Sequence, residues 1–308
     1  MPTPLQHRRL AALGVALLAT TALAACGSSS SSSGSTSSAP AQSSAASPSA
    51  DNALAAMVPD SIKSDGVITV GSDTTYAPSE FIAADGSTIQ GFDVDVFDAV
   101  AQELGLKAKF VTAPFDSIIA GVGSQKYEVG VSSFTINADR LKQVDMVSYF
   151  SAGTAWATKK GNPKKLQQDA ACGARIAVQK ATVQVDDITA RSKKCTSSGK
   201  PAITVDQYDG QDTATAAVVS GKDDAELADS PVIAYAVKQT NGQLETLGGI
   251  YDSSPYGIVV KKDQADFAKA IAAALKKTMS DGSYAKALAK WGVQDGAIKD
   301  PAVNPSVS

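Results

Sequence analysis

The amino-acid sequence predicts an α/β fold in which one chain builds two lobes and crosses between them twice. Strand-like and helix-like segments alternate from about residue 66, and a second alternating unit begins at residue 175. Such alternation is typical of a domain whose largely parallel sheet is covered by helices. The chain leaves the first unit near residues 154–160 and returns near residues 256–261, so we expect a cleft between two lobes.

In the first unit, the helix expected over residues 93–104 has the clearest periodicity. Its apolar residues recur at i, i+3, i+4 and i+7, the spacing of one helix face: Phe97, Val100, Ala101 and Leu104. Asp93 or Asp95 is expected to cap the start of this helix and Gly105 to close its end. The other elements predicted here are strands at 67–70, 107–111 and 127–132 and helices at 116–122 and 138–144.

The second unit repeats this order of elements. Its predicted strands are 175–178, 202–205 and 225–228, and its predicted helices are 183–190, 213–220 and 230–238. Two further helices, at 264–279 and 283–291, are expected to pack back on the first lobe. The predicted boundaries are lobe 1 at residues 61–157, lobe 2 at 158–255, and a return to lobe 1 with the C-terminal helices at 256–308.

Residues 1–60 are expected to lie outside the fold. A basic start and a short apolar run end in Leu23-Ala24-Ala25-Cys26, as in a secretory signal. This ending resembles a bacterial lipobox, which implies a signal peptide at 1–25 and a lipid anchor (palmitate) on Cys26. An ordinary signal peptide is the alternative. Residues 26–60 are rich in Ser, Ala and Gly, and we expect a disordered tether at the outer face of the cell membrane.

Charge and histidine content exclude several classes of function. Without residues 1–25 the chain keeps 26 basic against 31 acidic side chains, and a net charge of about −5 argues against nucleic acid as a partner. His7, the only histidine, leaves with that segment. The remaining chain cannot form a Ser-His-Asp or Cys-His catalytic site or a histidine-ligated metal site. No metal or cofactor is expected.

Two cysteines remain beside Cys26. In an exported protein an even pair, here Cys172 and Cys195, favours a disulfide. Closing a loop of about 24 residues would stabilise the fold by roughly 3 kcal/mol. Two free buried thiols are the alternative.

Polar and aromatic residues follow the predicted strands of both units. Ligands of parallel α/β sheets bind outside the carboxyl ends of the strands, so we expect these residues to meet in the cleft. Together they include an arginine, two aspartates, hydroxyl groups and aromatic rings, which suits a small zwitterion. The candidate ligand-binding residues are Asp73, Tyr76, Phe115, Ser133, Phe134, Thr135, Arg140, Gln179, Thr182, Val183 and Asp229.

The segment Gly91-Phe92-Asp93-Val94-Asp95, followed by an apolar helix, resembles the signature of the family 3 extracellular solute-binding proteins. Members of this family are amino-acid receptors of ABC importers with a two-lobed, type II periplasmic-binding-protein fold. The resemblance covers about residues 65–295. It implies an exported, membrane-anchored monomer that is not an enzyme. Such a protein delivers an amino acid to the permease of an ABC importer, whose ATPase is cytoplasmic.

Arg140 and Asp229 are the predicted partners of the two charged groups of an amino acid. A guanidinium offers a planar fork that matches a carboxylate, and Thr-x-x-x-Asp-Arg at residues 135–140 resembles the α-carboxylate site of the family. The stretch that ends in Asp229 resembles the part of the family that holds the ammonium group. The alternatives are a surface arginine paired with an acid, and an aspartate that only caps the next helix.

Tyr76 and Phe115 are expected to sandwich the ligand side chain, because they lie in loops at strand ends. The sequence also departs from the family pattern, which usually has an aromatic residue, Gly and Thr at three positions: Ser79, Ala181 and Val183. The departures weaken the assignment of Gln179 and Thr182 more than that of Arg140.

Asp73 is the predicted determinant of specificity. At this position of the family an aspartate can meet a polar or cationic ligand side chain. The hypothesis is therefore a polar or basic amino acid of the Gln, His, Arg or Lys type, although Lys180 could instead favour an acidic ligand. An aspartate that only bonds its own turn is the alternative.

Two rival functions are compatible with the same sequence pattern. Some proteins that resemble this family are cyclohexadienyl dehydratases or peptidoglycan lyases, whose chemistry needs an acid as proton donor in the cleft. Glu80 and Glu226 are the nearest candidates. The other rival is a ligand-sensing receptor whose closed form binds a signalling partner.

Overall fold

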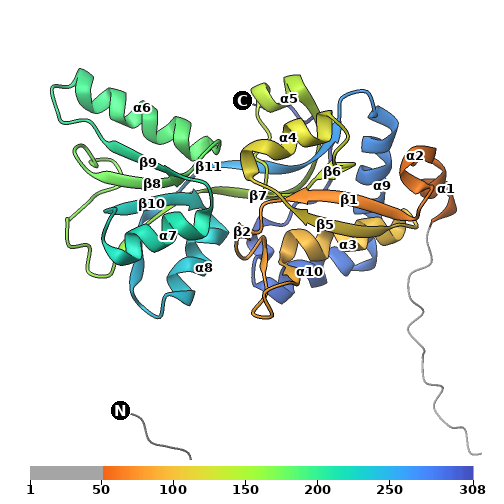
Figure 1. Ribbon diagram of the computed structural model, residues 1–308, viewed down its shortest axis with the longest axis horizontal. Helices are drawn as coiled ribbons and strands as arrows, with labels where there is room; N and C mark the ends of the chain where they lie inside the picture. Colours follow the sequence, from red (N-terminus) through yellow and green to blue (C-terminus); the bar gives the residue numbers. More distant parts are fainter. Residues whose placement is uncertain (1–50, 308) are drawn as a thin grey trace, which may run out of the picture. The chain divides into compact units, whose positions relative to one another are not determined.

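The computed structural model of the chain describes residues 51–307 (Figure 1). The predicted signal peptide, Cys26 and most of the predicted tether lie outside these residues. Within them, the predicted two-lobed α/β fold is confirmed, with a large sheet and helices on both of its sides.

Two long antiparallel strands run through both lobes: β7 (Val144–Lys159) and β11 (Leu244–Lys261). Together with six other strands of the described residues they form one eight-stranded sheet, in the order β5-β1-β6-β11-β7-β10-β8-β9. Figure 1 shows them crossing from one half of the body to the other. The sequence indicated only short connections here. Almost every residue of β7 is buried, so the strand lacks the alternation that reveals a half-buried strand.

Lobe 1 holds the parallel strands β5 and β6 on either side of β1. Its bounds are β1 Val67–Ser72, β5 Lys107–Thr112, β6 Val129–Gly130, α3 Phe92–Glu103, α4 Phe115–Gly123 and α5 Ala138–Gln143. The predicted apolar face of α3 is buried in the core of this lobe, against residues of β1, β7 and β11. The strand predicted over 127–132 is shorter than expected, because only two residues pair.

Lobe 2 repeats the arrangement with parallel strands β9, β8 and β10. Its bounds are β8 Arg175–Gln179, β9 Thr204–Tyr208, β10 Ala225–Asp229, α6 Val183–Ser197, α7 Gln211–Ser220 and α8 Ser230–Gln239. A disulfide joins Cys172 to Cys195, near the end of α6, with an S–S distance of 2.00 Å. Strand β10 pairs with β7 on its other side, which connects this lobe to the crossing strands.

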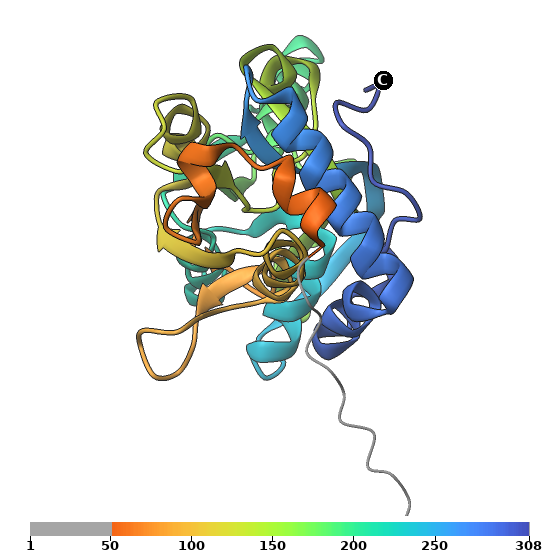
Figure 2. The same cartoon turned by 90° about the vertical axis from the view of Figure 1, so that its right-hand side faces the viewer.

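The ends of the described chain pack on lobe 1. The elements are α1 Asn52–Ala56, α2 Asp60–Lys63, α9 Ala265–Asp281, α10 Ser283–Trp291 and the short 3-10 helix η1 Gln294–Gly296. Figure 2 shows α9 alongside α1, and α9 and α10 both contact α3. The tether predicted to reach residue 60 is therefore too long. Val58 is only 2 % exposed and belongs to the core of lobe 1.

A small three-stranded sheet that the sequence did not indicate precedes α3. It consists of β2 Thr75–Tyr76, β3 Glu80–Ile82 and β4 Ile89–Gln90. Gly91 then begins the helix with a φ of +144°, and a Cβ there would lie 1.9 Å from the Ser79 carbonyl oxygen. The predicted aspartate caps are wrong, since the N-cap residue is Gly91 and no side chain caps this end. Asp93 is buried, and Asp95 accepts hydrogen bonds from Lys290 and Trp291.

Loss of the disulfide is expected to destabilise the body. The two cysteines are 23 positions apart, and closing such a loop is worth about 3 kcal/mol in the chain-entropy model. A Cys172→Ser, Cys195→Ser double variant should unfold at lower urea concentration than the wild type. Dithiothreitol should lower the wild-type midpoint to the same value and leave the variant unchanged. Equal midpoints for the oxidised wild type and the variant would contradict this assignment.

Candidate functional site

A small cavity lies where the strand-end loops of the two lobes meet. Its volume is about 10 Å³, enough for about one water molecule. It is lined by Tyr76, Phe115, Ser132, Ser133, Thr135, Arg140, Gln179, Thr182, Val183, Gln184 and Asp229. All of the predicted site residues except Asp73 and Phe134 line it. Ser132 and Gln184 line it without having been predicted.

Arg140, in the first turns of α5, reaches from lobe 1 toward lobe 2. Its Nη1 donates to the Thr135 carbonyl oxygen at 2.8 Å, and its Nη2 donates to the Ala181 carbonyl oxygen of lobe 2 at 3.2 Å. The side chain is almost fully buried, and burial lowers the pKa of Arg140 to about 10 although the charge of Asp229 opposes this. A surface arginine paired with a neighbouring acid is therefore excluded.

Asp229 ends β10 on the other side of the cavity. Its Oδ1 accepts a hydrogen bond from Gln184 Nε2 at 2.8 Å, and its backbone N–H donates to the Tyr76 hydroxyl at 3.2 Å. Burial raises the pKa of Asp229, while the Tyr256 and Tyr76 hydroxyls, the Gln184 amide and the Arg140 charge act in the opposite direction. Its side chain does not cap α8, so the capping alternative is excluded.

Tyr76 and Phe115, the predicted sandwich, both line the cavity, and each makes a further contact there. Phe115 stacks on Phe134, with ring centroids 4.6 Å apart and an interplanar angle of 16°. The Arg140 guanidinium carbon lies 5.4 Å from the centre of each of these rings. Phe134 therefore supports the cavity wall from behind, while the Tyr76 hydroxyl contacts the Asp229 backbone across the lobes.

Asp73 lies behind the cavity wall and not on it. Its Oδ1 accepts from the Thr75 N–H at 3.0 Å and the Thr75 hydroxyl at 2.7 Å, so it does bond its own turn. Its Oδ2 also accepts from Gln179 Nε2 of lobe 2 at 2.6 Å. Burial raises the pKa of Asp73. Lys180 does not approach this carboxylate, because it pairs with Asp116 and Asp209 instead.

The polar loops of the cavity are held by their own hydrogen bonds. The Ser133 N–H donates to Asp93 Oδ2 at 2.9 Å. The Thr182 hydroxyl donates to the Gln179 carbonyl oxygen at 2.7 Å. Gln184 follows Val183 in the first turn of α6. It lies only five residues after Gln179, the last residue of β8, and this short spacing from a strand end is the sequence signal that could have identified it.

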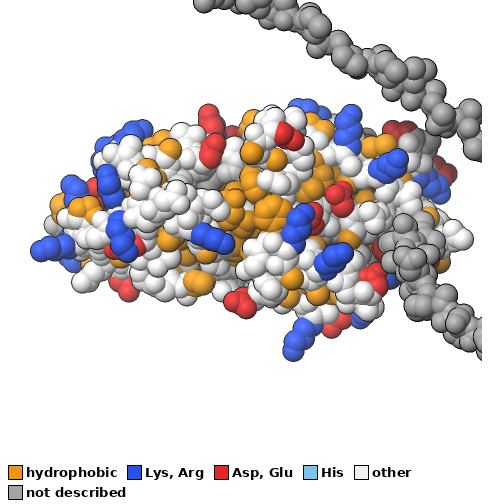
Figure 3. All heavy atoms as spheres, turned by 90° about the horizontal axis from the view of Figure 1, so that it is seen from below, with side chains coloured by type: hydrophobic (Ala, Val, Ile, Leu, Met, Phe, Trp, Pro, Cys, Tyr) orange, Lys and Arg blue, Asp and Glu red, His pale blue; other side chains and the backbone are white. Residues whose placement is uncertain are grey.

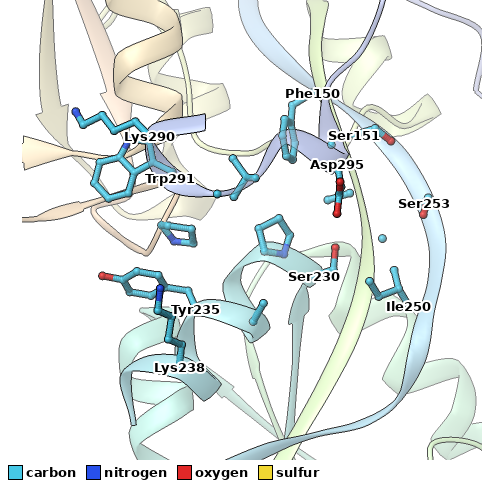
Figure 4. A pocket seen from close by; sticks show the side chains of 18 residues that line it. Phe150, Ser151, Ser230, Tyr235, Lys238, Ile250, Ser253, Lys290, Trp291 and Asp295 are labelled. Carbon is cyan, nitrogen blue, oxygen red and sulfur yellow. The ribbon is translucent and has the colours of Figure 1, made fainter. Parts of the chain in front are cut away.

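A larger groove of about 610 Å³ lies elsewhere between the lobes (Figure 4). Its walls come from α8, from the end of α10 and from the crossing strands, with Tyr235, Trp291 and Ile250 among the lining residues. Figure 3 shows apolar side chains gathered on the face that includes this region. None of the predicted site residues lines this groove. Its lining also contains no pair of buried, oppositely charged side chains that face each other. The small cavity therefore remains the candidate site.

Comparison with known proteins places the chain in a family. The model of the bacterial extracellular solute-binding proteins, family 3, matches residues 68–294. The chain belongs to this family. The family resemblance seen at residues 91–95 is thereby confirmed.

The relatives of this solute-binding protein are named for amino acids. The arginine-binding protein ArgT of Corynebacterium glutamicum is 33% identical over 252 residues, covering 82% of each chain. The glutamine-binding protein GlnH of a Bacillus subtilis ABC transporter is 30% identical over 213 residues, covering 68% of this chain and 75% of its own length. Among solved structures, an ancestral arginine-binding protein bound to arginine is 32% identical with a TM-score of 0.68, covering 73% of this chain and 98% of its own.

The two glutamates considered as catalytic acids do not line the cavity. Glu80 is buried against Ser132. Glu226 is fully buried in β10, where it accepts hydrogen bonds from Gln211 and Thr215. Residues 51–307 contain no cluster of His, Cys, Asp and Glu suited to a metal ion. No helix in this range is long and apolar enough to cross a membrane.

Burial raises the pKa of Glu226 from 4.5 to about 7. A carboxyl whose folded pKa is raised stabilises the fold below its unfolded pKa, and this contribution is lost as pH rises through the folded pKa. The difference in free energy of unfolding between Glu226→Gln and wild type should therefore move in favour of the variant as pH rises from about 4.5 to about 7, by on the order of 3 kcal/mol.

Urea unfolding of Glu226→Gln and wild type at a series of pH values tests this expectation. Glu245→Gln, at a partly exposed carboxylate that faces Lys160, is the matched control. A difference between Glu226→Gln and wild type that does not change with pH would show that Glu226 is ionised in the folded protein.

Proposed function

We propose that this chain is the extracytoplasmic substrate-binding lipoprotein of an ABC importer, and that it captures a polar or basic L-amino acid by lobe closure. The observation that carries the proposal is the meeting of Arg140 and Asp229, an oppositely charged pair from different lobes, at one buried cavity. The membership of the chain in a solute-binding family supports the same role.

Arg140 is suited to the ligand carboxylate. Both terminal nitrogens of its guanidinium donate to backbone carbonyl oxygens, of Thr135 and Ala181. A carboxylate in the cavity would offer charged acceptors to the same fork, and charge-assisted bidentate bonds are about twice as strong as neutral ones. Asp229, at the opposite lobe, would accept the ammonium group. Each buried charge of the pair would then gain a charged partner.

Asp73 supports a ligand with a polar or cationic side chain. Thr75 and Gln179 give this buried carboxylate hydrogen bonds, but no lysine or arginine of residues 51–307 forms a salt bridge with it. In the open form, in which the bond from Gln179 to Asp73 is broken, a cationic group of the ligand would reach this carboxylate and supply the missing charge. Relatives named for binding arginine and glutamine are consistent with this class of ligand.

The cycle requires the lobes to separate and close. A cavity of about 10 Å³ is too small for an amino acid, so the ligand gains access only when the contacts between the lobes break. These contacts include the bonds from Gln179 to Asp73 and from the Gln211 N–H to Thr75. The crossing strands β7 and β11 would act as the hinge. The closed form would be presented to the permease by a monomer anchored through Cys26.

A screen of the purified body against the twenty amino acids tests the ligand class. A ligand at 100 times its dissociation constant adds about 2.7 kcal/mol to stability, which a thermal-shift assay detects. We expect shifts with arginine, lysine, histidine or glutamine. Shifts with only glutamate and aspartate would refute the specificity assigned to Asp73. The absence of any shift would refute amino-acid binding.

Arg140→Lys is expected to weaken binding of L-arginine at least tenfold, because a point charge cannot replace two hydrogen bonds of a planar fork. Isothermal titration measures the loss. Arg191→Lys is the matched control, since this arginine pairs with Asp187 in lobe 2 and does not line the cavity. Equal affinity of Arg140→Lys and wild type would remove Arg140 from the site.

A further inference from the structure

A pair of buried carboxyl groups lies directly behind the cavity wall formed by Ser132 and Ser133. Glu80, in β3, accepts a hydrogen bond from the Ser132 hydroxyl at 2.7 Å. Asp93, in the first turn of α3, accepts from the Ser133 N–H at 2.9 Å, the Ser133 hydroxyl at 3.2 Å and the Tyr149 hydroxyl at 2.6 Å. Both carboxyl side chains are fully buried.

The second oxygen of each carboxyl, Glu80 Oε2 and Asp93 Oδ1, has no donor among residues 51–307. The two carboxyls accept hydrogen bonds from consecutive residues, Ser132 and Ser133, and the charge of Asp93 acts on the pKa of Glu80. No lysine or arginine in the described chain forms a salt bridge with either of them. Two adjacent buried carboxylates without a cation would repel each other strongly, so such a pair retains a proton.

The surrounding donors indicate which carboxyl holds the proton. Asp93 accepts hydrogen bonds from three groups, whereas Glu80 accepts one. Donors favour the ionised form of a carboxyl. Burial raises the pKa of Glu80 well above its ordinary value, and the charges of Asp93 and Asp73 raise it further. Burial also raises the pKa of Asp93, but hydrogen bonds from Glu80, Tyr149 and Ser133 oppose that rise.

We propose that Glu80 is a neutral carboxylic acid that donates its proton to the Asp93 carboxylate, and that this pair positions Ser132 and Ser133 in the wall of the ligand cavity. Ser133 has a φ of +49°, in the left-handed region, and Asp93 holds it through both its N–H and its hydroxyl. Ser132 Oγ also accepts the Asp73 N–H at 3.0 Å, so the pair supports the Asp73 turn as well.

The positioning role rests on the proposed function, whereas the shared proton does not. Glu80→Gln is the decisive variant, because its amide N–H can donate to Asp93 and its carbonyl oxygen can accept from Ser132. With L-arginine as the probe, the affinity of the Glu80→Gln variant should stay within about threefold of that of the wild type. Glu80→Ala should bind at least tenfold more weakly, since it leaves both partners unsatisfied.

Unfolding in urea tests the proton without any ligand. A carboxyl that is neutral in the folded protein loses its stabilising contribution as pH rises through the raised pKa. The urea midpoint of Glu80→Gln relative to wild type should therefore increase as pH rises above the ordinary pKa of a glutamate, about 4.3. Glu103→Gln is the matched control, because Glu103 is an equally buried carboxylate of lobe 1 that pairs with Lys277 at 2.8 Å.

Two results would overturn the proposal: Glu80→Gln as weak in binding as Glu80→Ala, or a midpoint difference that stays constant with pH. If L-arginine and every other amino acid fail to bind the wild type, the proposed function fails, but the unfolding comparison still decides on the proton. If Glu80→Ala does not fold, the urea comparison of Glu80→Gln decides alone.

Discussion

The pairing of β7 with β11 is the constraint on which the rest of the structure depends. Both strands run through both lobes, so the six other strands of the large sheet are placed relative to this one antiparallel ribbon. The pairing is irregular between Leu247 and Gly257, where the chain passes from one lobe to the other. The ribbon also reaches the cavity, because Gln184 donates to Thr154 of β7 and Thr135 bridges to Tyr256 of β11. A substitution that shifts β7 or β11 would therefore also displace residues of the cavity wall.

The candidate site concentrates buried charge where the lobes meet. Arg140 comes from lobe 1 and Asp229 from lobe 2, and each is almost fully buried. Charges interact more strongly in a low-dielectric interior than in water, and unsatisfied ones cost more there. The carboxyls of Glu80 and Asp93 extend this polar region into the core of lobe 1, where neutral donors surround them. Exclusion of water would strengthen ligand recognition. It also makes a second buried negative charge costly, so that Glu80 keeps its proton in the core.

Much of the fold and of the candidate site could be predicted from the sequence. Helical spacing located α3, and strand-end loops located most residues of the cavity wall, because parallel strands bring their carboxyl ends to one edge. The failures also have physical reasons. Strand β7 is buried on both faces and shows no alternation, and the pairs within β2–β4 are too short to leave a pattern. Phe134 and Asp73 were correctly placed in strand-end loops, but side-chain packing turned them away from the cavity.

The sequence by itself determined the α/β class, the order of the elements and the residue types suited to a zwitterion, because periodicity and turn chemistry are local properties. The family signature at residues 91–95 belongs to that local record, and its structural role is to begin α3 and to bury Asp93. Only the tertiary structure decided what Asp93 contacts. Its partners Ser133 and Tyr149 are 40 and 56 positions away, and hydrogen bonds over such separations arise from packing and leave no spacing in the sequence.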